Sequence, residues 1–203
     1  MSTSAPSQVE LPAPAEIPTL YFIGVTTGKS SIQTVFPRWA AEFGLGKVRL
    51  HGIDLPLHAP RDSYRAVAEF IANDPLSAGA LVTTHKIDMY EACEDIFDEI
   101  DPLAALMGET SCLSKRDGRF VCHAKDPISS GLAIEAFVPD GYWAETGAEV
   151  FLMGAGGSAI AISWFLTRPE RGADRPSRIV VSNRSPQRLD ALRPLARRAG
   201  SVA

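Results

Sequence analysis

A lysine and an aspartate stand at positions where proton-transfer chemistry is expected. Lys86 follows the apolar run LVTTHK, just beyond the end of a predicted strand, and Asp126 follows a predicted hairpin in the stretch HAKDP. Strand ends gather at the edge of a sheet, so these two side chains can meet there. A cation and a carboxylate together can move the proton that accompanies hydride transfer to a carbonyl. Lys86 and Asp126 are therefore the candidate catalytic residues, and the alternative is that each is an ordinary surface charge.

The stretch EVFLMGAGGSAIAISWFL, residues 149–166, predicts a phosphate-binding turn. An apolar strand pattern ends at GAGG and resumes as a helix of small residues. Gly154, Gly156 and Ala159 match the G-x-G-x-x-[GA] fingerprint, in which backbone amides approach a phosphate at the positive end of a helix. Such a turn also arises for packing alone, but the flanking strand and helix favour a dinucleotide. The predicted cofactor-binding residues of this turn are Gly154, Ala155, Gly156, Gly157 and Ser158.

The stretch SNRSPQR follows the next predicted strand and indicates which dinucleotide is bound. An acidic residue at this place is typical of NAD sites, whereas positive charge suits the 2′-phosphate of NADP. Asn183, Arg184, Ser185 and Arg188 offer two guanidinium groups and two short polar side chains, with no carboxylate before Asp190. These four residues predict NADP as the cofactor. The alternative is that the arginines are a solvated helix start.

Strands and helices alternate along the chain, which predicts an α/β fold with mostly parallel sheets. Apolar, β-favouring runs predict strands at 19–25, 48–55, 79–85, 149–153 and 178–183, and a β-hairpin at 109–123. Helical spacing predicts helices at 61–74, 87–101, 129–138, 158–167 and 186–200. A further helix is expected from Ser30 or Ser31 to the glycines of FGLG, with one face made by Val35, Phe36, Trp39, Ala40 and Phe43.

The composition excludes several classes of function. The chain has 203 residues, of which 45% are hydrophobic, so it can bury a normal core. A net charge of −4 offers no basic field for nucleic acid. No apolar run approaches the roughly 20 residues of a spanning helix, and the N-terminus lacks a signal-peptide pattern. We therefore expect a cytoplasmic protein without nucleic-acid or membrane partners, and we predict no metal site.

Six motifs, in the same order, resemble those of the shikimate dehydrogenase family. The members of this family are NADP-dependent oxidoreductases. GVTTGKSSIQ resembles the family's opening glycine and serine motif, LVTTHK its NVTxPxK loop, and GETSC its GAVNT segment. AKDP resembles its NTDG segment, GAGG its glycine turn, and NRSPQR its NRTxxR motif. The resemblance extends from about Tyr21 to Arg198.

The resemblance implies a domain layout and a set of roles. Lys86 and Asp126 become the acid/base pair, Ser30 and Thr83 contact the carboxylate side of the substrate, and the C-terminal glycines and arginines hold NADP. The expected parts are a loose tail at 1–18, a substrate-binding and catalytic domain at 19–127, a connecting helix and loop at 128–147, and a partial Rossmann domain for NADP at 148–203.

The chain also departs from the family pattern at its substrate contacts. Ile32 stands where the family has a second serine, Leu81 and Ser111 stand where it has asparagines, and the loop before Lys86 is shorter. Because a site built for one hydroxyl rejects ligands that lack it, the substrate is either shikimate or a related acid. Lys29 replaces a usual histidine and is either a cation for a carboxylate or an exposed loop lysine. The predicted substrate-binding residues are Ser30, Thr83, Ser111 and Lys29.

Two functions from different classes follow. The first is an NADP-dependent dehydrogenase that reduces 3-dehydroshikimate to shikimate or acts on a related cyclic hydroxy acid. The second is a non-catalytic or truncated homologue that binds a dinucleotide or a carboxylate. The family's dinucleotide layer continues beyond the strands and helix present here, so we expect either a fragment or a short form. The oligomeric state stays open, with a homodimer as one alternative.

Overall fold

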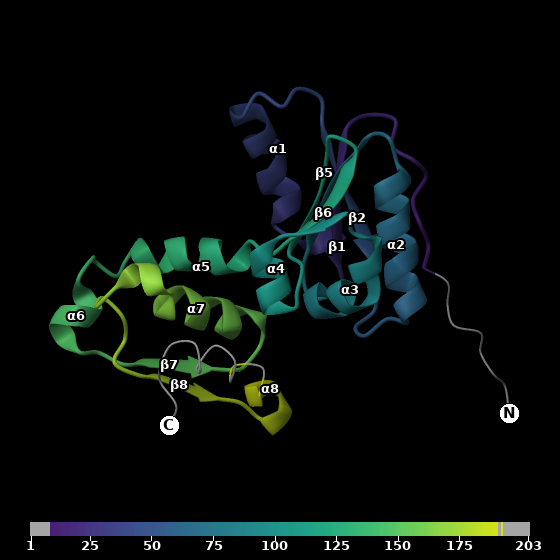
Figure 1. Ribbon diagram of the computed structural model, residues 1–203. Coiled ribbons are helices and arrows are strands. Elements are labelled where there is room, and N and C mark those ends of the chain that lie inside the picture. The colour runs from purple at the N-terminus through teal and green to yellow at the C-terminus, as the bar shows by residue number, and fades with distance from the viewer. Residues whose placement is uncertain (1–8, 191, 193–203) are drawn as a thin grey trace, which may run out of the picture. The chain divides into compact units, whose positions relative to one another are not determined.

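The computed structural model of the protein describes residues 9–190 and residue 192 (Figure 1). The chain divides into two compact units, with the division between Ala124 and Lys125. Each unit has its own sheet flanked by helices, which confirms the predicted α/β class. The predicted end of the substrate-binding part, at residue 127, lies close to this division. The roles assigned to the two parts stay predictions.

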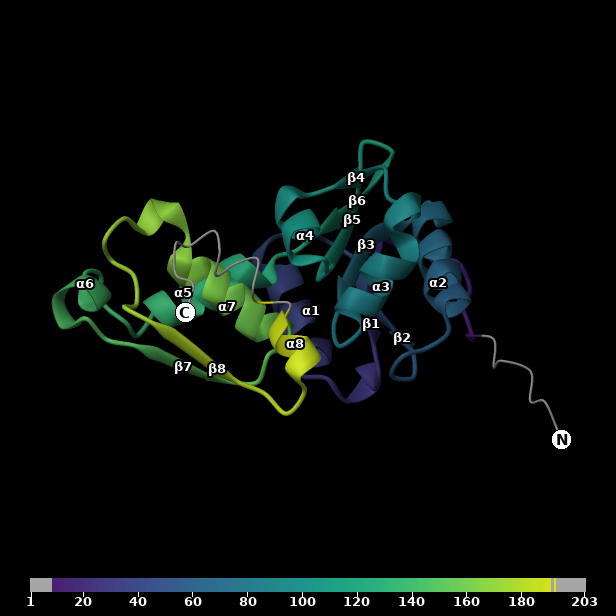
Figure 2. The same cartoon turned by 60° about the horizontal axis from the view of Figure 1, so that its bottom comes forward.

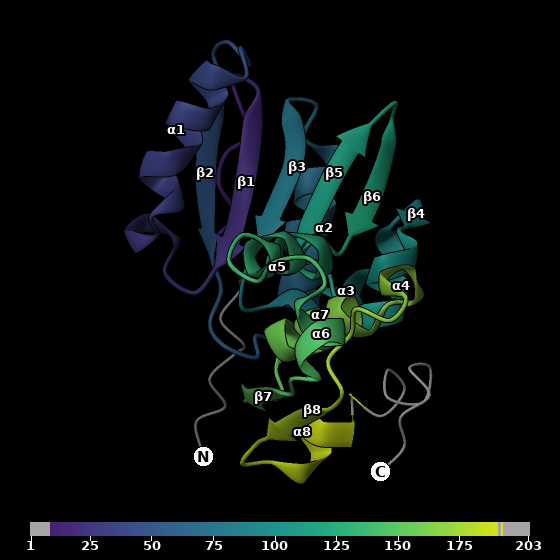
Figure 3. The same cartoon turned by 90° about the vertical axis from the view of Figure 1, so that its left-hand side faces the viewer.

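The first unit is built on a six-stranded mixed sheet in the order β2-β1-β3-β5-β6-β4 (Figure 3). Its strands are β1 (Thr19–Gly24), β2 (Arg49–Asp54), β3 (Ser77–Val82), β4 (Glu99–Ile100), β5 (Cys112–Arg116) and β6 (Arg119–His123). Strand β1 pairs in parallel with β2 and β3, whereas β5 is antiparallel to both of its neighbours. The predicted hairpin is thus confirmed. The parallel strands β2, β1 and β3 all end at one edge of the sheet.

Helices cover both faces of this sheet (Figures 1 and 3). Helix α1 (Ile32–Glu42) lies on one face, and α2 (Arg61–Asn73) and α3 (Lys86–Cys93) lie on the other. The apolar face predicted for α2 is confirmed, since Tyr64, Val67, Ala68 and Ile71 are all buried. The short elements of this unit are the 3-10 turns η1 (Thr27–Lys29) and η2 (Glu94–Ile96) and helix α4 (Pro102–Met107).

The apolar face predicted for α1 is only partly buried. Phe36 and Ala40 are buried, whereas Trp39 is 53% exposed and Phe43 is 70% exposed. The reason is position, because α1 packs on the edge strand β2, and little sheet lies beneath the rest of the helix.

The helix predicted at 87–101 is wrong beyond Cys93. Helix α3 ends there, and the chain continues as η2 and the short strand β4. Two arginines of α2 explain the end of the helix. Arg61 donates to the carbonyl of Glu91 at 2.7 Å, and Arg65 donates to the carbonyl of Ala92 at 2.9 Å. Because these bonds satisfy carbonyls in the last turn, the helix has a stop that its own acidic sequence does not reveal.

The second unit has a two-stranded parallel sheet, β7 (Val150–Met153) and β8 (Ile179–Ser182). Helix α7 (Gly157–Thr167) lies between this sheet and helix α5 (Asp126–Glu135), as Figures 1 and 2 show. Trp143, Phe165 and Leu166 form the centre of its apolar cluster. The remaining elements are α6 (Tyr142–Thr146), η3 (Pro169–Arg171) and α8 (Pro186–Asp190).

The strands and the helix predicted around the glycine turn are confirmed within a residue or so at each end. Of the last predicted helix, 186–200, the structure describes α8, and the residues beyond 192 lie outside the described part of the chain. No helix in the described part has both the length and the apolar character needed to cross a bilayer.

Candidate functional site

Most of the predicted substrate-binding residues lie at the carboxyl edge of the parallel strands in the first unit. Neighbouring strand ends are tied together there, because Leu55 donates to the carbonyl of Gly24 at 2.8 Å and Thr83 donates to that of Ile23 at 3.0 Å. The loops that carry Ser30 and Lys86 leave β1 and β3 at this edge. Ligands of such sheets usually bind at the carboxyl ends of the parallel strands.

The loop after β1 is held by Asp54 at the end of β2. One carboxylate oxygen of Asp54 accepts hydrogen bonds from the backbone N–H of Thr27 at 2.8 Å and from its hydroxyl at 2.6 Å. The hydroxyl of Thr27 lies where a Cβ on Gly52 would stand, at 2.0 Å, so only glycine fits at that position. This anchor fixes the start of the loop that carries Lys29 and Ser30.

Within that loop the two candidate side chains differ in exposure. Ser30 is half-buried, and its hydroxyl oxygen accepts a long hydrogen bond of 3.4 Å from the backbone N–H of Ile32. Lys29 is exposed. Both lie on the carboxyl side of the sheet, and their contact with a substrate stays a prediction.

The loop after β3 reverses direction within three residues. Thr84 has a left-handed φ of +60°, which is unusual for a β-branched residue. The backbone N–H of His85 donates to the carbonyl of Thr83 at 2.5 Å, and Lys86 then begins α3. The carbonyl of Lys86 in turn accepts a hydrogen bond of 3.0 Å from Thr110. The backbone of Lys86 is therefore held by the tight, strained turn that precedes it and by the hydrogen bond from Thr110.

Ser111 stands beside this turn. Its carbonyl accepts from the N–H of Val82 at 3.0 Å, and its own N–H donates to the carbonyl of His123 at 2.9 Å. Ser111 is buried at this edge of the sheet, with 3% of its surface exposed. The structure thus brings Ser111, Thr83 and Lys86 to one edge.

A buried polar cluster supports the turn and was not recognised in the sequence. The Nε2 of His85 lies 3.1 Å from the carbonyl oxygen of Leu55, and its Nδ1 lies 3.1 Å from the hydroxyl of Tyr64. The same hydroxyl accepts from the N–H of Ala59 at 3.2 Å and lies 3.2 Å from a carboxylate oxygen of Asp88. Burial, followed by the charge of Asp88, raises the pKa of Tyr64 to about 12, so the hydroxyl stays protonated.

Asp126, the second candidate catalytic residue, is the first residue of α5 and belongs to the second unit. Lys86 belongs to the first unit. Their pairing therefore stays a prediction.

The glycine turn of the second unit has the form needed for a phosphate. Gly154 has a φ of +111°, which favours glycine, and a Cβ built on Gly156 would meet no atom within 4 Å. Gly156 is the N-cap of α7, and no described side chain caps that helix. The backbone at Gly156 is therefore open to a ligand beside the positive end of an 11-residue helix. The predicted turn residues Ala155, Gly157 and Ser158 complete this segment.

The second predicted cofactor segment lies next to this turn. Gly154 donates to the carbonyl of Ser182 at 2.7 Å, so the ends of β7 and β8 are adjacent. Asn183 follows and donates to the carbonyl of Ser185 at 3.0 Å, which shapes the loop around the exposed Arg184. The side chain of Arg188 lies outside the described part of the structure. The residues present fit a dinucleotide, since an open glycine turn and an exposed guanidinium stand at the same sheet edge.

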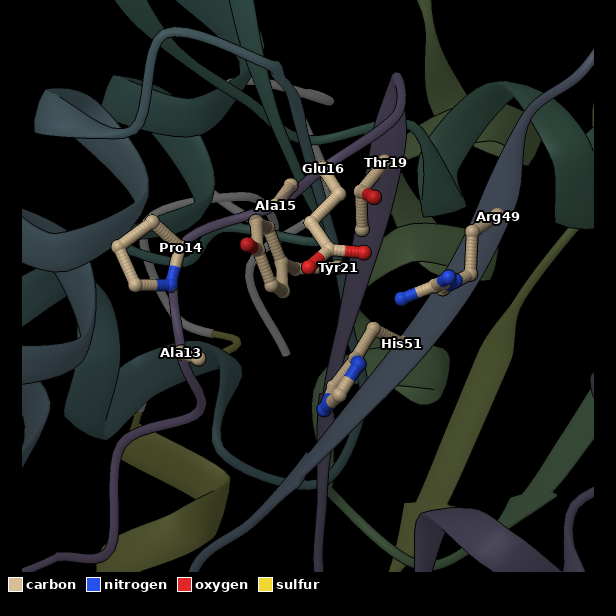
Figure 4. Close-up of a pocket in the computed structure, with 8 residues that line it drawn as sticks. All are labelled: Ala13, Pro14, Ala15, Glu16, Thr19, Tyr21, Arg49 and His51. Carbon is tan, nitrogen blue, oxygen red and sulfur yellow. The ribbon is translucent and has the colours of Figure 1, made fainter.

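A pocket of about 200 Å³ lies at the opposite end of the first unit's sheet (Figure 4). It is lined by Ala13, Pro14, Ala15, Glu16, Thr19, Tyr21, Arg49 and His51. The segment over it is tied down, because the N–H of Ala15 donates to the carboxylate of Asp74 at 3.1 Å. Since Thr19 and Arg49 begin β1 and β2, this pocket is separate from the edge that carries Lys86.

Asp74 is buried beneath this segment and is unusually well bonded. It accepts from the hydroxyl of Tyr21 at 2.5 Å and from the N–H of Leu76 at 3.0 Å. Burial acts to raise the pKa of Asp74, but these bonds, the bond from Ala15 and the charge of Lys115 together hold it below its ordinary value. Asp74 is therefore a structural anchor, ionised at neutral pH.

No group of three or more His, Cys, Asp or Glu side chains that could hold a metal ion is found among residues 9–190 and 192.

The comparisons with known proteins identify the fold. No protein-family model matches the chain, and no curated protein matches it. Solved structures do match. A shikimate dehydrogenase in complex with NADP+ is 21% identical, with 98% of this chain and 62% of that chain covered and a TM-score of 0.68.

Two further structures give the same result. Shikimate 5-dehydrogenase from Listeria monocytogenes, in complex with shikimate and NAD, is 19% identical over 94% of this chain and 60% of that chain, with a TM-score of 0.66. Quinate dehydrogenase from Corynebacterium glutamicum, in complex with NAD, is 19% identical over 91% and 62%, with a TM-score of 0.66. The chain thus has the fold of shikimate and quinate dehydrogenases and spans about three fifths of their length.

Proposed function

We propose that the chain belongs to the shikimate dehydrogenase family and acts as an NADP-dependent oxidoreductase. Its substrate is 3-dehydroshikimate, reduced to shikimate, or a related cyclic hydroxy acid. The observation that carries the proposal is the turn after β3, which presents Lys86 at the carboxyl edge of a sheet with the fold of these dehydrogenases. The shared fold supports the reaction class, and the residues of the edge support its chemistry.

Lys86 acts as the acid in this proposal. When the substrate carbonyl is reduced, negative charge develops on its oxygen, and the lysine ammonium stabilises that charge and donates a proton. Asp126 holds the lysine in position and in its charged state. NADP, when bound, supplies or accepts the hydride. Because the two residues act in the transition state, their loss should affect kcat more than KM.

The substrate carboxylate is bound by the loops after β1 and β3. Ser30 and Thr83 offer hydroxyl donors, and Lys29 offers a cation at the exposed side of the edge. Ser111 contributes at the base of the edge, where its hydroxyl takes the place of an asparagine. Ile32 and Leu81 supply no polar contact, so we propose an acid with fewer hydroxyl contacts than shikimate makes in the family as an alternative substrate.

The cofactor preference is assigned to the loop after β8. Gly154, Ala155, Gly156, Gly157 and Ser158 hold the pyrophosphate, and Asn183, Arg184, Ser185 and Arg188 hold the 2′-phosphate of NADP. Arg184→Ala should weaken binding of NADP by about 1.5–3 kcal/mol and leave NAD nearly unchanged. Calorimetric titration measures both ligands. Arg178→Ala is the matched control, because Arg178 precedes the first residue of β8, at the end away from Arg184, and forms an ion pair with Glu149 at 2.7 Å.

The activity is tested by the absorbance of the reduced nicotinamide, with shikimate, quinate and related ring acids offered with NADP and with NAD. Lys86→Ala should lower kcat by about 10²–10⁴-fold. Lys47→Ala, at an exposed loop position, is the control. Tight NADP binding without turnover of any acid would instead favour the non-catalytic binding module. Turnover that survives Lys86→Ala would refute the assignment of the lysine.

A further inference from the structure

In the buried cluster below the strained turn, both ring nitrogens of His85 lie within hydrogen-bond distance of a partner. His85 is 1% exposed and Tyr64 is 2% exposed. The carbonyl of Leu55 can only accept, so the Nε2 of His85 is assigned as the donor. The Nδ1 of the same ring lies 3.1 Å from the hydroxyl of Tyr64, which also lies within hydrogen-bond distance of Asp88 at 3.2 Å. The ring of His85 is therefore clamped on both sides.

The contacts of the His85 ring join three segments of the first unit. Leu55 follows β2, Tyr64 belongs to α2, and His85 is the N-cap of α3. The carbonyl of His85 accepts from the N–H of Met89 at 2.8 Å, which starts the helix. The residue that carries the held ring is therefore also the residue from which α3 begins.

Thr84 makes this clamp necessary. A β-branched residue at φ +60° is strained and persists only when its surroundings hold it. On one side, Thr83 is bonded to β1. On the other side, the buried ring of His85 lies within hydrogen-bond distance of the hydroxyl of Tyr64 and the carbonyl of Leu55. Release of that ring would let the turn relax and would displace Lys86, the next residue.

We propose that His85 is a positioning residue whose ring, held by Tyr64 and the carbonyl of Leu55, sets the place of Lys86. Its effect on turnover rests on the function proposed above, whereas its effect on the placement of Lys86 does not. The two consequences can therefore be measured separately.

The first measurement needs no turnover. Amine labelling of the whole chain, followed by mass spectrometry of peptides, gives the rate at Lys86 relative to the exposed Lys47. In Tyr64→Phe and in His85→Asn, Lys86 should be labelled faster, with Lys47 unchanged. His85→Gln should restore a slower rate, because its longer amide reaches the Nε2 position and can still donate to Leu55.

Tyr90→Phe is the matched control, because Tyr90 lies on α3 but outside the clamp. A rate at Lys86 that is the same in the parent, Tyr64→Phe and His85→Asn would overturn the proposal. If His85→Asn does not fold, Tyr64→Phe decides alone, since it removes one oxygen and keeps the ring in place.

The second measurement is steady-state kinetics. A displaced catalytic group typically slows the chemical step by up to roughly 100-fold, so kcat should fall in Tyr64→Phe and His85→Asn while KM for NADP stays constant. If Lys86→Ala leaves kcat intact, the catalytic role proposed for Lys86 fails, and the labelling result still decides whether His85 sets the place of Lys86. If Lys86→Ala stops turnover but both clamp variants keep full kcat, the clamp does not position the lysine.

Discussion

Gly131 is the position in the second unit where we expect a single methyl group to be most harmful. It lies on α5, where that helix contacts α7. A Cβ at this position would lie 2.0 Å from Cδ2 of Phe165, well below the 3.0 Å that real Cβ contacts respect. Phe165 is 1% exposed, and the guanidinium of Arg168 stands 3.8 Å from its ring centroid. The ring therefore has no empty space into which to move.

The size of the effect follows from two opposing contributions. Overpacking of a tight core costs about 1–3 kcal/mol and sometimes more. Alanine in place of glycine in a helix returns about 0.5–1 kcal/mol. Since the contact must lengthen by at least 3.0 − 2.0 = 1.0 Å, the helices have to separate, and the upper part of the overpacking range applies. We therefore expect Gly131→Ala to lower the free energy of unfolding of this unit by about 2 kcal/mol.

Urea unfolding measures this free energy. Trp143 and Trp164 report on the second unit, and Trp39→Phe removes the signal of the exposed tryptophan in the first unit. Gly28→Ala is the control, because a Cβ there would meet nothing within 4 Å. Phe165→Leu added to Gly131→Ala should recover part of the loss by making room. Undiminished stability of Gly131→Ala alone would show that α5 and α7 do not approach as closely as described.

Substitutions at the two ends of the first sheet test its anchors. Asp74→Asn should lower stability at neutral pH by about 1.5–3 kcal/mol, because one bond to the buried charge is lost. Since the pKa of Asp74 is depressed, this stabilisation is present above the unfolded-state pKa of about 3.9 and disappears as the pH falls through the folded-state value. A difference in urea midpoints between the parent and Asp74→Asn that does not shrink at acidic pH would contradict this prediction. Thr84→Gly should raise the free energy of unfolding by up to about 1 kcal/mol in thermal unfolding, because glycine adopts the left-handed conformation of this position without strain. The same change should slow turnover, because the turn before Lys86 is then less rigid. A loss of stability would show that the turn is not strained. Asp54→Asn should raise KM for the acid substrate more than Kd for NADP, because the anchor of Thr27 and its loop is weakened; an equal change in both would argue for general unfolding.

Much of the fold was predictable because it depends on local pattern. The strands of the parallel core were placed correctly from their apolar runs, and the hairpin at Cys112–His123 from its flanking β-prone runs and turn. Helix α4 was missed although its signal is present. Asp101 caps it by accepting from Leu103 and Ala104, proline follows at the first helical position, and Gly108 ends it in the left-handed region.

Other features could not be predicted because tertiary contacts decide them. The end of α3 depends on arginines from α2, far away in sequence. The exposure of Trp39 depends on α1 lying over an edge strand. In both cases the local sequence is compatible with the predicted structure, and contacts with another element decide the outcome.

The candidate site combines both kinds of feature. Lys86 was predicted from its place after a strand, which is a matter of pattern. The residues proposed to hold it are Thr84, with its left-handed backbone, and His85, with its buried ring. Both lie in the loop that is shorter than the motif it resembles. A shorter loop must turn more sharply, so it needs a residue in a strained conformation and a buried partner to keep it there. Local rules fail most often where function requires a particular geometry. The left-handed Thr84 is therefore a reason to test Lys86, two residues further along the chain, for the catalytic role proposed above.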